Sequence, residues 1–434
     1  MHTLADLRAG KLAGSKRLDL SCGLTQFPEE IFTLSDTLQV LNLTGNQLSE
    51  LPADLHRLTH LKILFCSDNL FTRLPECLGE CSQLFFVGFK ACRISEVSPR
   101  ALPGNVRSLV LTDNCITTLP EEVGNLEHLQ KLMMAGNRLQ NLPASLVRCR
   151  KLELLRISAN LISELPQWLL SMPALAWLAF AGNPLSDAHV EEPIRQIPWP
   201  QLSVDQLLGQ GASGIIQQGQ WRRENAVQDV AVKLYKGAVT SDGSPLNEMA
   251  ACRAAGQHAN LIPVEGQVVG HPDDAQGLVM QLIAPSFTIL ARPPSLESCT
   301  RDVYEAVILD ASALDKIATG IAAACGHLHR RGINHGDLYG HNILREQDGN
   351  CLLGDFGAAA FYPDARTGRK LERIEVRAYG ILLGELLACC EDITAQDRER
   401  WAGLEQDCVQ EDVDKRPGFA EIEQRLRSGW ASIP

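Results

Sequence analysis

Apolar residues recur at a fixed spacing through the first half of the chain, and an asparagine closes most of the units. The pattern LxxLxLxxN recurs with a period of 23 residues. Its clear copies occupy residues 38–46, 61–69, 106–114, 129–137, 152–160 and 175–183. Alternating leucines predict a short strand with one face in a core, and the Leu-Pro pair that follows most copies predicts a return segment. Such a unit cannot bury its apolar face alone, so neighbouring units must stack.

Weaker copies beginning at Ser15 and Leu84 keep the frame, which makes eight units in all. The set resembles the leucine-rich repeat family over residues 15 to about 185. This resemblance implies an α/β solenoid that serves as a recognition surface. We therefore predict a leucine-rich repeat domain over residues 1–198, with residues 1–14 and 184–197 covering its two ends.

Strand alternation also predicts which residues face the open, concave side of the solenoid. Many of these residues are apolar, and a contiguous apolar strip of this kind typically binds a protein. The partner expected there is a protein substrate or ligand. In the alternative register, shifted by one residue, the same side chains belong to the core. The predicted concave set includes Val40, Asn42, Ile63, Phe65, Phe86, Val110, Met133, Leu154, Arg156 and Trp177.

The 23-residue period stops at the segment IPWPQL, residues 197–202, and a different pattern begins. Two prolines stiffen this segment, so it predicts a short linker between domains. The second predicted domain covers residues 203–434.

Glycines and a lysine open this second domain. The stretch LLGQGASGII, residues 207–216, contains G-x-G-x-x-G, in which backbone amides can approach a phosphate closely. A dinucleotide-binding fold uses a similar motif, but there the motif opens a helix and an acidic residue follows about 20 positions later. Here VAVKLY, residues 230–235, predicts a strand that carries Lys233, and Glu248 lies on a predicted helix where it can pair with that lysine.

Two further motifs complete the order. A buried strand is predicted at LVMQLI, residues 278–283, and is followed by HGDLYGHNIL at 335–344 and LLGDFGAA at 352–359. Together with the glycine motif and Lys233, these motifs resemble the protein kinase family over residues 203–430. The resemblance implies an α+β two-lobed domain, with an N-lobe at about 203–281 and a C-lobe at about 284–430, that uses ATP and Mg²⁺.

The family's roles carry over to matching positions. Asp337 would orient the attacking hydroxyl and accept its proton, and Lys233 would neutralise the nucleotide phosphates. Asn342 and Asp355 would hold magnesium, while His335 would brace the loop. The residues expected to border the nucleotide are Gly209, Gln210, Gly211, Ala212, Ser213, Gly214, Ile216, Ala231, Lys233, Glu248, Met280, Leu282 and Ile283.

Three positions depart from the kinase pattern. Gly336 stands where the family has an arginine that binds a phosphate on the activation loop, which suggests activity without such phosphorylation. Tyr339 stands where serine/threonine kinases place a lysine, and tyrosine kinases carry an arginine either there or at the position of His341. Such a cation lowers the barrier to transfer. Lys370 and Arg373 are the replacements that the sequence suggests.

Three functions therefore stay open. The favoured one is an ATP-dependent protein kinase, with serine or threonine as the expected acceptor and the repeats supplying recognition. The motif HGDL without a following lysine also resembles antibiotic and choline phosphotransferases, which act on small molecules. A catalytically silent scaffold is the third, although such proteins usually lose one of the four residues Lys233, Asp337, Asn342 and Asp355, all present here.

Composition narrows the partners. A formal net charge of −12 disfavours nucleic acid and an anionic membrane surface, both of which attract basic proteins. The sequence contains no apolar run of membrane-spanning length, and the N-terminal residues do not resemble a signal peptide. Its 14 cysteines lack zinc-type spacing and predict free thiols. A cytoplasmic location is expected.

Overall fold

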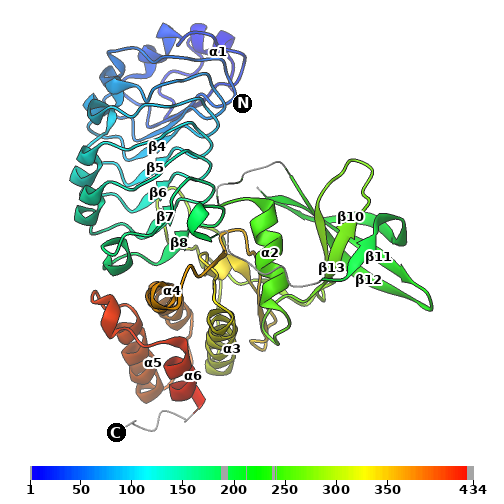
Figure 1. Cartoon of the computed structure of the whole chain (residues 1–434). Helices are drawn as coiled ribbons and strands as arrows, with labels where there is room; N and C mark the ends of the chain where they lie inside the picture. Colours follow the sequence, from blue (N-terminus) through cyan, green and yellow to red (C-terminus); the bar gives the residue numbers. More distant parts are fainter. Residues whose placement is uncertain (1, 187–193, 212, 237–239, 241, 428–434) are drawn as a thin grey trace. The chain divides into compact units, whose positions relative to one another are not determined.

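The computed structural model describes residues 2–186, 194–211, 213–236, 240 and 242–427 (Figure 1). It contains two compact units, Met1–Leu175 and Ala176–Pro434. The predicted boundary lies later, at residues 198–203. The strand β8, at Trp177–Ala179, packs on helix α4 of the second unit, which accounts for the difference.

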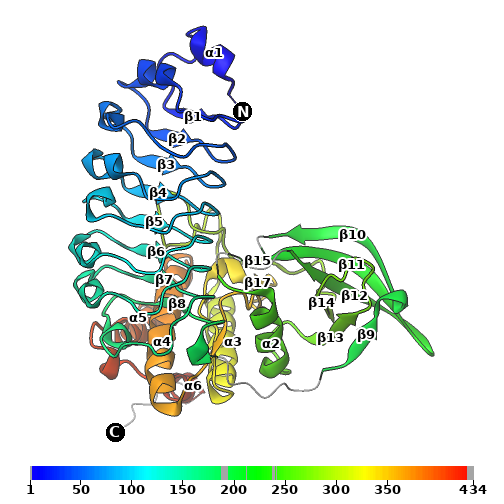
Figure 2. The same cartoon turned by 45° about the horizontal axis from the view of Figure 1, so that its top comes forward.

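The first unit is a stack of short parallel strands, each followed by a return segment that contains a 3-10 helix (Figure 2). Helix α1, at Leu4–Arg8, precedes the stack. The strands are β1 Arg17–Asp19, β2 Val40–Asn42, β3 Ile63–Phe65, β4 Phe86–Gly88, β5 Ser108–Val110, β6 Lys131–Met133 and β7 Leu154–Arg156. The 3-10 helices are η1 Glu29–Leu34, η2 Leu55–Arg57, η3 Glu76–Glu80, η4 Pro99–Ala101, η5 Glu121–Asn125, η6 Ala144–Arg148 and η7 Leu169–Ser171. This architecture confirms the predicted leucine-rich repeat solenoid.

The central residue of each strand points into the core. These residues are fully buried and comprise Leu18, Leu41, Leu64, Val87, Leu109, Leu132 and Leu155. The predicted period-two alternation is therefore present, and the register is not shifted by one residue.

The predicted concave set divides into two groups. Val40, Asn42, Phe65, Phe86, Val110 and Met133 are partly exposed. Ile63, Leu154, Arg156 and Trp177 are buried, contrary to the prediction. Ile63 is paired with Val40 on one side and with Phe86 on the other, and Trp177 lies against the ring of Tyr339. The exposed apolar strip is therefore shorter than the sequence suggests.

The repeated asparagines join successive repeats by hydrogen bonds. Asn137 donates from Nδ2 to the carbonyl of Leu111, in the preceding repeat, at 2.9 Å and to that of Met134 at 3.0 Å. Its Oδ1 accepts from the amide of Ile116 at 3.0 Å. Buried backbone groups that leave the regular strand pattern need such partners. The recurring asparagine is thus explained by hydrogen bonds that cross from one repeat to the next.

Two repeats lack this asparagine, the first, which has Gly23 at this position, and one within the stack. Cys92 stands at the corresponding position, with its Sγ 3.5 Å from the carbonyl of Cys66 and 3.7 Å from that of Lys90. A thiol is both a weaker donor and a weaker acceptor than an amide. The row of asparagine contacts is interrupted here.

The second unit contains a six-stranded sheet with the order β10-β11-β12-β14-β13-β9. Its strands are β9 Gln196–Pro198, β10 Leu202–Gln210, β11 Gly214–Arg223, β12 Ala226–Tyr235, β13 Val264–Val269 and β14 Gly277–Gln281. Helix α2, at Pro245–Ala255, lies beside this sheet (Figure 2). The predicted linker is therefore part of the sheet, because β9 pairs in parallel with β13 through Ile197 and Val268.

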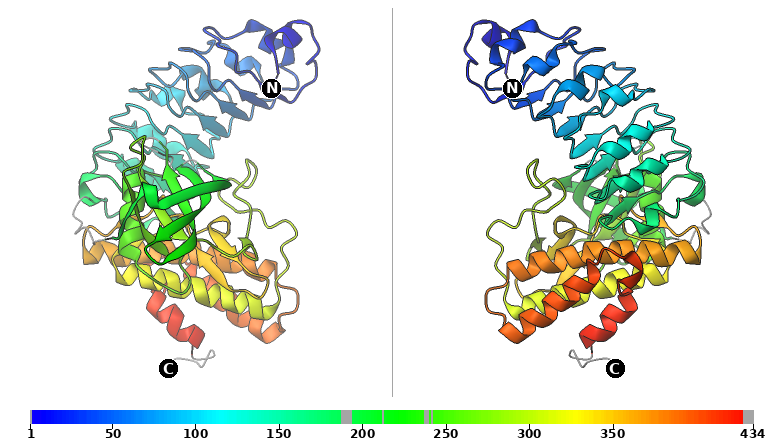
Figure 3. Two further views of the ribbon diagram at one scale, coloured as in Figure 1. Left: turned by 90° about the vertical axis from the view of Figure 1, so that its right-hand side faces the viewer. Right: turned by 90° about the vertical axis from the view of Figure 1, so that its left-hand side faces the viewer.

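The rest of the unit is mainly helical. Helices α3, at Ala311–Arg330, and α4, at Ala365–Ala388, run side by side (Figure 3, yellow and orange). The remaining helices are α5 Ala395–Cys408, α6 Phe419–Arg427, η8 Pro184–Ser186, η9 Trp199–Gln201, η10 Gly340–Asn342 and η11 Val413–Lys415. The short strands are β15 Thr288–Ile289, β16 Ile333–Asn334, β17 Ile343–Arg345, β18 Cys351–Leu353 and β19 Ala360–Phe361. A strand-rich lobe followed by a helical lobe is the predicted kinase-like arrangement.

Two further predictions concern the whole chain. All fourteen cysteines are free thiols, as expected. Among the described residues, no helix has both the length and the apolar character needed to cross a membrane.

We predict that Asn137→Ala lowers the local free energy of opening in the repeats by about 2–4 kcal/mol, because it leaves buried backbone groups without partners. Hydrogen exchange of peptides from residues 106–140 measures this energy. The control is Asn105→Ala, at an exposed side chain whose Nδ2 contacts the carbonyl of Ser82. Equal changes in the two variants would contradict the role assigned to the asparagine row.

Candidate active site

Lys233 and Glu248 form a buried ion pair. Lys233 lies in β12 opposite Ile216 of β11, and its Nζ contacts Oε1 of Glu248. Ser244 and Pro245 begin helix α2, which carries Glu248, with the Ser244 hydroxyl accepting from the amide of Leu246.

Electrostatics keep this lysine charged. Burial opposes the positive charge of Lys233, but the carboxylates of Glu248 and Asp355 outweigh burial and raise the pKa of the ammonium group. Burial also raises the pKa of Glu248, which Lys233 partly offsets. A rigid strand and a helix therefore hold a cation at a fixed position.

A cavity of about 130 Å³ adjoins this pair. Five residues of the predicted site line it, namely Ile216, Lys233, Glu248, Met280 and Asp355. The other lining residues are Tyr235, Cys252, Ile262, Val264, Leu278, Gly354 and Phe356. Strand pairing explains why these residues meet, since β12 lies between β11 and β14 in the sheet.

The other predicted nucleotide contacts are not among the residues that line this cavity. Ala231 is buried and pairs with Met280 across β12 and β14. Leu282 and Ile283 directly follow β14. Gly209 and Gln210 end β10, Gly211 follows them, and Ser213 precedes Gly214 at the start of β11. Ala212 lies outside the described residues.

The glycines of this hairpin differ in their surroundings. A Cβ at Gly209 or Gly211 would meet nothing within 4 Å, whereas a Cβ at Gly214 would lie 2.5 Å from the carbonyl oxygen of Leu234. Gly214 is thus required by the close approach of β12. The open space beside Gly209 and Gly211 leaves their backbone accessible to a ligand.

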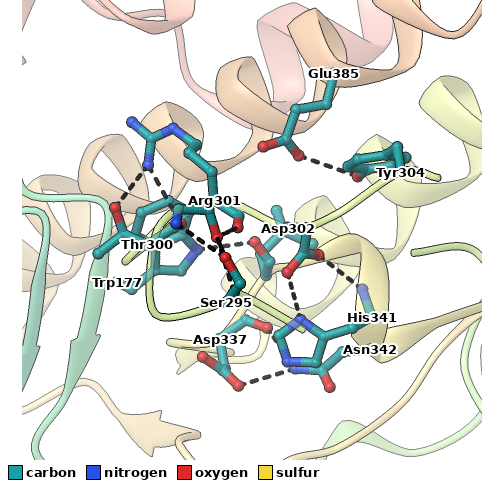
Figure 4. Close-up of polar contacts among 12 residues, drawn as sticks. Trp177, Ser295, Thr300, Arg301, Asp302, Tyr304, Asp337, His341, Asn342 and Glu385 are labelled. Carbon is teal, nitrogen blue, oxygen red and sulfur yellow. Dashed lines mark hydrogen bonds and ion pairs between the residues drawn. The ribbon is translucent and has the colours of Figure 1, made fainter. Parts of the chain in front are cut away.

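The predicted catalytic loop, residues 335–344, brings Asp337 and Asn342 into contact. Asn342 donates from Nδ2 to the Asp337 carboxylate Oδ2 and to the Asp337 carbonyl, each at 2.9 Å (Figure 4). The short helix η10 supplies the turn that folds Asn342 back onto Asp337. The five-residue spacing therefore brings the predicted base and the predicted metal ligand together.

Backbone contacts place Asp355 next to this loop. The amide of Gly354 donates to the Asn342 carbonyl at 2.9 Å, and the His335 Nε2 lies 2.9 Å from the Gly354 carbonyl. The Asp337 amide donates to His335 Nδ1 at 3.3 Å. His335 is buried and both its nitrogens are occupied by the backbone, so it braces the loop, as the sequence suggests.

Glu375 of α4 binds the backbone of the same loop through its carboxylate. Its carboxylate accepts from the amides of His335, at 3.2 Å, and of Gly336, at 2.6 Å. His329 Nε2 lies 2.7 Å from Oε2, the carboxylate oxygen that also accepts from the His335 amide. Burial opposes ionisation of Glu375, but His329, His335 and the Gly336 amide outweigh it and lower its pKa.

The backbone explains why residue 336 is a glycine. Gly336 has φ of +74°, and a Cβ there would lie 2.6 Å from the Ala358 carbonyl oxygen and 2.8 Å from that of Leu178. A side chain at this position would therefore collide with two backbone segments. The arginine usual in kinases does not fit.

Several residues around the loop carry no motif and were missed by sequence reasoning. The buried Asp302 accepts from the His341 amide at 2.9 Å, and its Oδ1 lies 2.7 Å from the His341 Nδ1 (Figure 4). Burial opposes protonation of His341, but Asp302 outweighs it and raises its pKa. Nearby, Tyr304 donates to the Glu385 carboxylate at 3.0 Å, and burial raises the pKa of Glu385 to about 7.

Lys370 and Arg373, suggested by the sequence as replacements for the missing cation, both contact Asp414. Lys370 donates to the Asp414 Oδ1 at 2.6 Å, and Arg373 donates to the Asp414 carbonyl. Both lie in α4, where these contacts join the helix to η11. The prediction that they supply charge to the catalytic loop is therefore not supported by the geometry.

The donor set suits a magnesium nucleotide. No group of three or more histidine, cysteine, aspartate or glutamate side chains that could hold a metal occurs in the described part of the chain. Mg²⁺ prefers oxygen ligands and usually retains water and substrate phosphates, so one carboxylate and one amide can suffice. Asp355 and Asn342 carry such oxygens, and Lys233 carries a positive charge that would suit a phosphate.

Comparisons with known proteins found a match to a protein family in each half of the chain. Residues 202–379 match the family model described as protein tyrosine and serine/threonine kinase. Residues 104–192 match a leucine-rich repeat region, and residues 37–58 match a leucine-rich repeat.

Individual relatives match the chain only in part. Human kinase suppressor of Ras 2 is 25% identical over 181 residues, which are 42% of this chain and 17% of that protein. Mitogen-activated protein kinase kinase kinase 13-B of Xenopus laevis is 25% identical over 215 residues, 44% of this chain and 19% of that protein. The chain thus spans less than a fifth of the length of these relatives. The solved structure of a leucine-rich repeat protein of Leptospira interrogans is 29% identical to this chain, with a TM-score of 0.39. The match covers 41% of this chain and 45% of that protein's chain.

We predict that Glu375→Gln lowers the free energy of unfolding by about 2–4 kcal/mol at pH 7, because it removes the charge that the surrounding donors stabilise. The lowered folded-state pKa makes this stabilisation complete above the ordinary value of 4.5 and progressively lost as pH falls below it. Urea unfolding at pH 7 and pH 4 should therefore show a smaller difference between wild type and variant at pH 4. The exposed Glu399→Gln is the control, and a difference independent of pH would count against this role of the carboxylate.

Proposed function

Because the chain combines leucine-rich repeats with a protein kinase domain, we propose that it transfers the γ-phosphoryl group of ATP to a protein hydroxyl group. Serine or threonine is the expected acceptor, and the repeats would select the protein partner. A cytoplasmic location remains part of this proposal.

One observation carries the proposal: the lysine, the base and the two metal ligands of the kinase pattern are present and lie near one another, although the cation usual between Asp337 and Asn342 is missing. Lys233 pairs with Glu248 at the cavity that Asp355 also lines, and Asn342 contacts Asp337. A silent scaffold would have no need for a buried lysine, a base and two metal ligands held in this arrangement. Burying such charges costs free energy, so their retention favours chemistry.

Each residue has a defined task in this mechanism. Lys233, fixed by Glu248, binds phosphate oxygens and withdraws negative charge. Asn342 and Asp355 would hold Mg²⁺, which neutralises charge on the phosphates when bound. Asp337 would orient the acceptor hydroxyl and accept its proton as the oxygen attacks the γ-phosphorus and the bond from that phosphorus to the ADP oxygen breaks. Positioning and charge stabilisation would supply most of the rate.

A second candidate keeps the chemistry and changes the acceptor. Helix α4 begins at Ala365 and continues without interruption through Glu375, so few residues separate it from Gly357. A segment this short offers little surface for an extended peptide, which favours a small hydroxylated acceptor. The repeats favour a protein acceptor, since a small-molecule enzyme has no use for a protein-recognition surface.

We predict that Lys233→Met and Asp337→Asn each reduce phosphoryl transfer at least about a hundredfold. The assay is incubation with labelled ATP and magnesium, followed by separation of protein-bound and small-molecule products. Label on protein supports the proposed function, and label only on an added aminoglycoside or choline supports the second candidate.

The matched controls are Lys151→Met and Asp348→Asn, at exposed positions. They should retain wild-type activity. Binding of ATP by the wild-type protein without any turnover would instead identify a scaffold.

The recognition role of the repeats has its own test. Val110, a partly exposed residue at the end of β5, belongs to the predicted concave set. We predict that Val110→Lys changes which proteins of a dephosphorylated extract become labelled, while transfer to a generic peptide stays within about twofold, because a charge disrupts an apolar contact surface. Val147→Lys, in η6 and 45% exposed, makes the same replacement elsewhere and should change neither property. Identical labelling by all three proteins would exclude the concave surface as the recognition site.

A further inference from the structure

Strand β8 makes direct contact with the catalytic loop inside the second unit. The indole of Trp177 stacks on the ring of Tyr339, with centroids 4.3 Å apart and planes at 6°. The same indole donates from Nε1 to the Leu338 carbonyl at 2.9 Å. Trp177 is 1% exposed, so its side chain is fully buried where it contacts the loop.

The backbone of β8 continues this contact. The Leu178 carbonyl accepts from Asn334 Nδ2 at 3.2 Å, just before the loop. The same carbonyl is one of the two groups that leave room only for glycine at position 336. One strand thus touches the residues that flank Asp337 on both sides.

A loop of the helical lobe supports this contact from another direction. The guanidinium of Arg301 lies 5.4 Å from the centre of the Trp177 ring, and Asp302 fixes His341 as described above. Tyr339 and His341 are themselves in ring contact, with centroids 5.0 Å apart. The residues between Asp337 and Asn342 are therefore packed between β8 and this loop.

The device that commonly orders a kinase catalytic loop does not fit here. With Gly336 in place of the usual arginine, the loop has no guanidinium there to bind a phosphate. The residues from Ala365 onward belong to helix α4. Thr367, in the first turn of that helix, is buried, and its hydroxyl donates to the Asp364 carboxylate at 2.6 Å. A phosphate on this threonine would have to break the helix cap.

We propose that β8 replaces a phosphorylated activation segment: Trp177 acts as a positioning residue that holds Leu338 and Tyr339 so that Asp337 is aligned for transfer. This inference rests on the proposed function for its catalytic consequence. Trp177 itself touches no reacting group. Its effect is transmitted through the loop, where a displacement of about 1 Å can cost about a hundredfold in rate.

The test compares the full-length wild type with Trp177→Ala, Trp177→Phe and the control Trp401→Phe, which replaces another buried tryptophan in α5. Trp177→Ala should lower kcat about 10- to 100-fold, with the KM for ATP changed less than about threefold, because the strand-rich lobe is untouched. Trp177→Phe keeps a ring against Tyr339 and should recover most of the loss. Trp401→Phe should leave kcat unchanged.

Hydrogen exchange of a peptide covering residues 335–344 provides a readout that does not need activity. Exchange should accelerate in Trp177→Ala and stay at the wild-type rate in Trp401→Phe. Unchanged exchange and kcat in Trp177→Ala would overturn the inference, as would an increase in kcat, which would mean that β8 blocks the site. A wild type without phosphoryl transfer would refute the proposed function alone, and the exchange rates would still decide whether β8 orders the loop.

Discussion

The buried carboxylate of Glu375 is the contact on which the site depends. It binds two successive backbone amides of the catalytic loop and so joins that loop to the longest helix of the second unit. From this anchor, His335 reaches the Gly354 carbonyl and Asn342 reaches Asp337. The buried charge of Glu375 thus helps to position Asp337 and Asn342 in the loop and, through Gly354, Asp355 in the next segment. Its burial is expensive unless every oxygen is satisfied, and here several donors converge on it.

Local sequence was sufficient for the parts of the molecule that repeat or that carry a compact motif. Alternating leucines determine the strands of the solenoid, and the asparagine row follows from backbone groups that need partners. The Lys233–Glu248 pair was also predicted, because a strand and a helix with recognisable patterns carry its two members. These features are set by interactions that recur in register along the chain.

Contacts between distant segments could not be predicted in the same way. Asp302 lies in a loop without a recognisable pattern, and its pairing with His341 depends on how that loop folds over η10. The prediction for Trp177 was wrong because the residue has the same strand position as the partly exposed Val40 and Phe86, whereas its neighbour is a tyrosine far along the sequence. Lys370 and Arg373 were chosen by proximity in sequence, but helix geometry directs them to Asp414. In each case the deciding partner is remote in the chain.

The cysteine that interrupts the asparagine row has a consequence for how the solenoid comes apart. In a linear array, cooperativity is transmitted only through the interface between adjacent units, so the weakest interface sets where the array divides. Cys92 sits at such an interface and provides a thiol in place of a bidentate amide. Under tension or mild denaturant, the turns before it would separate as one block while those after it remain folded. One cysteine in place of an asparagine can thus define the size of the cooperative folding unit.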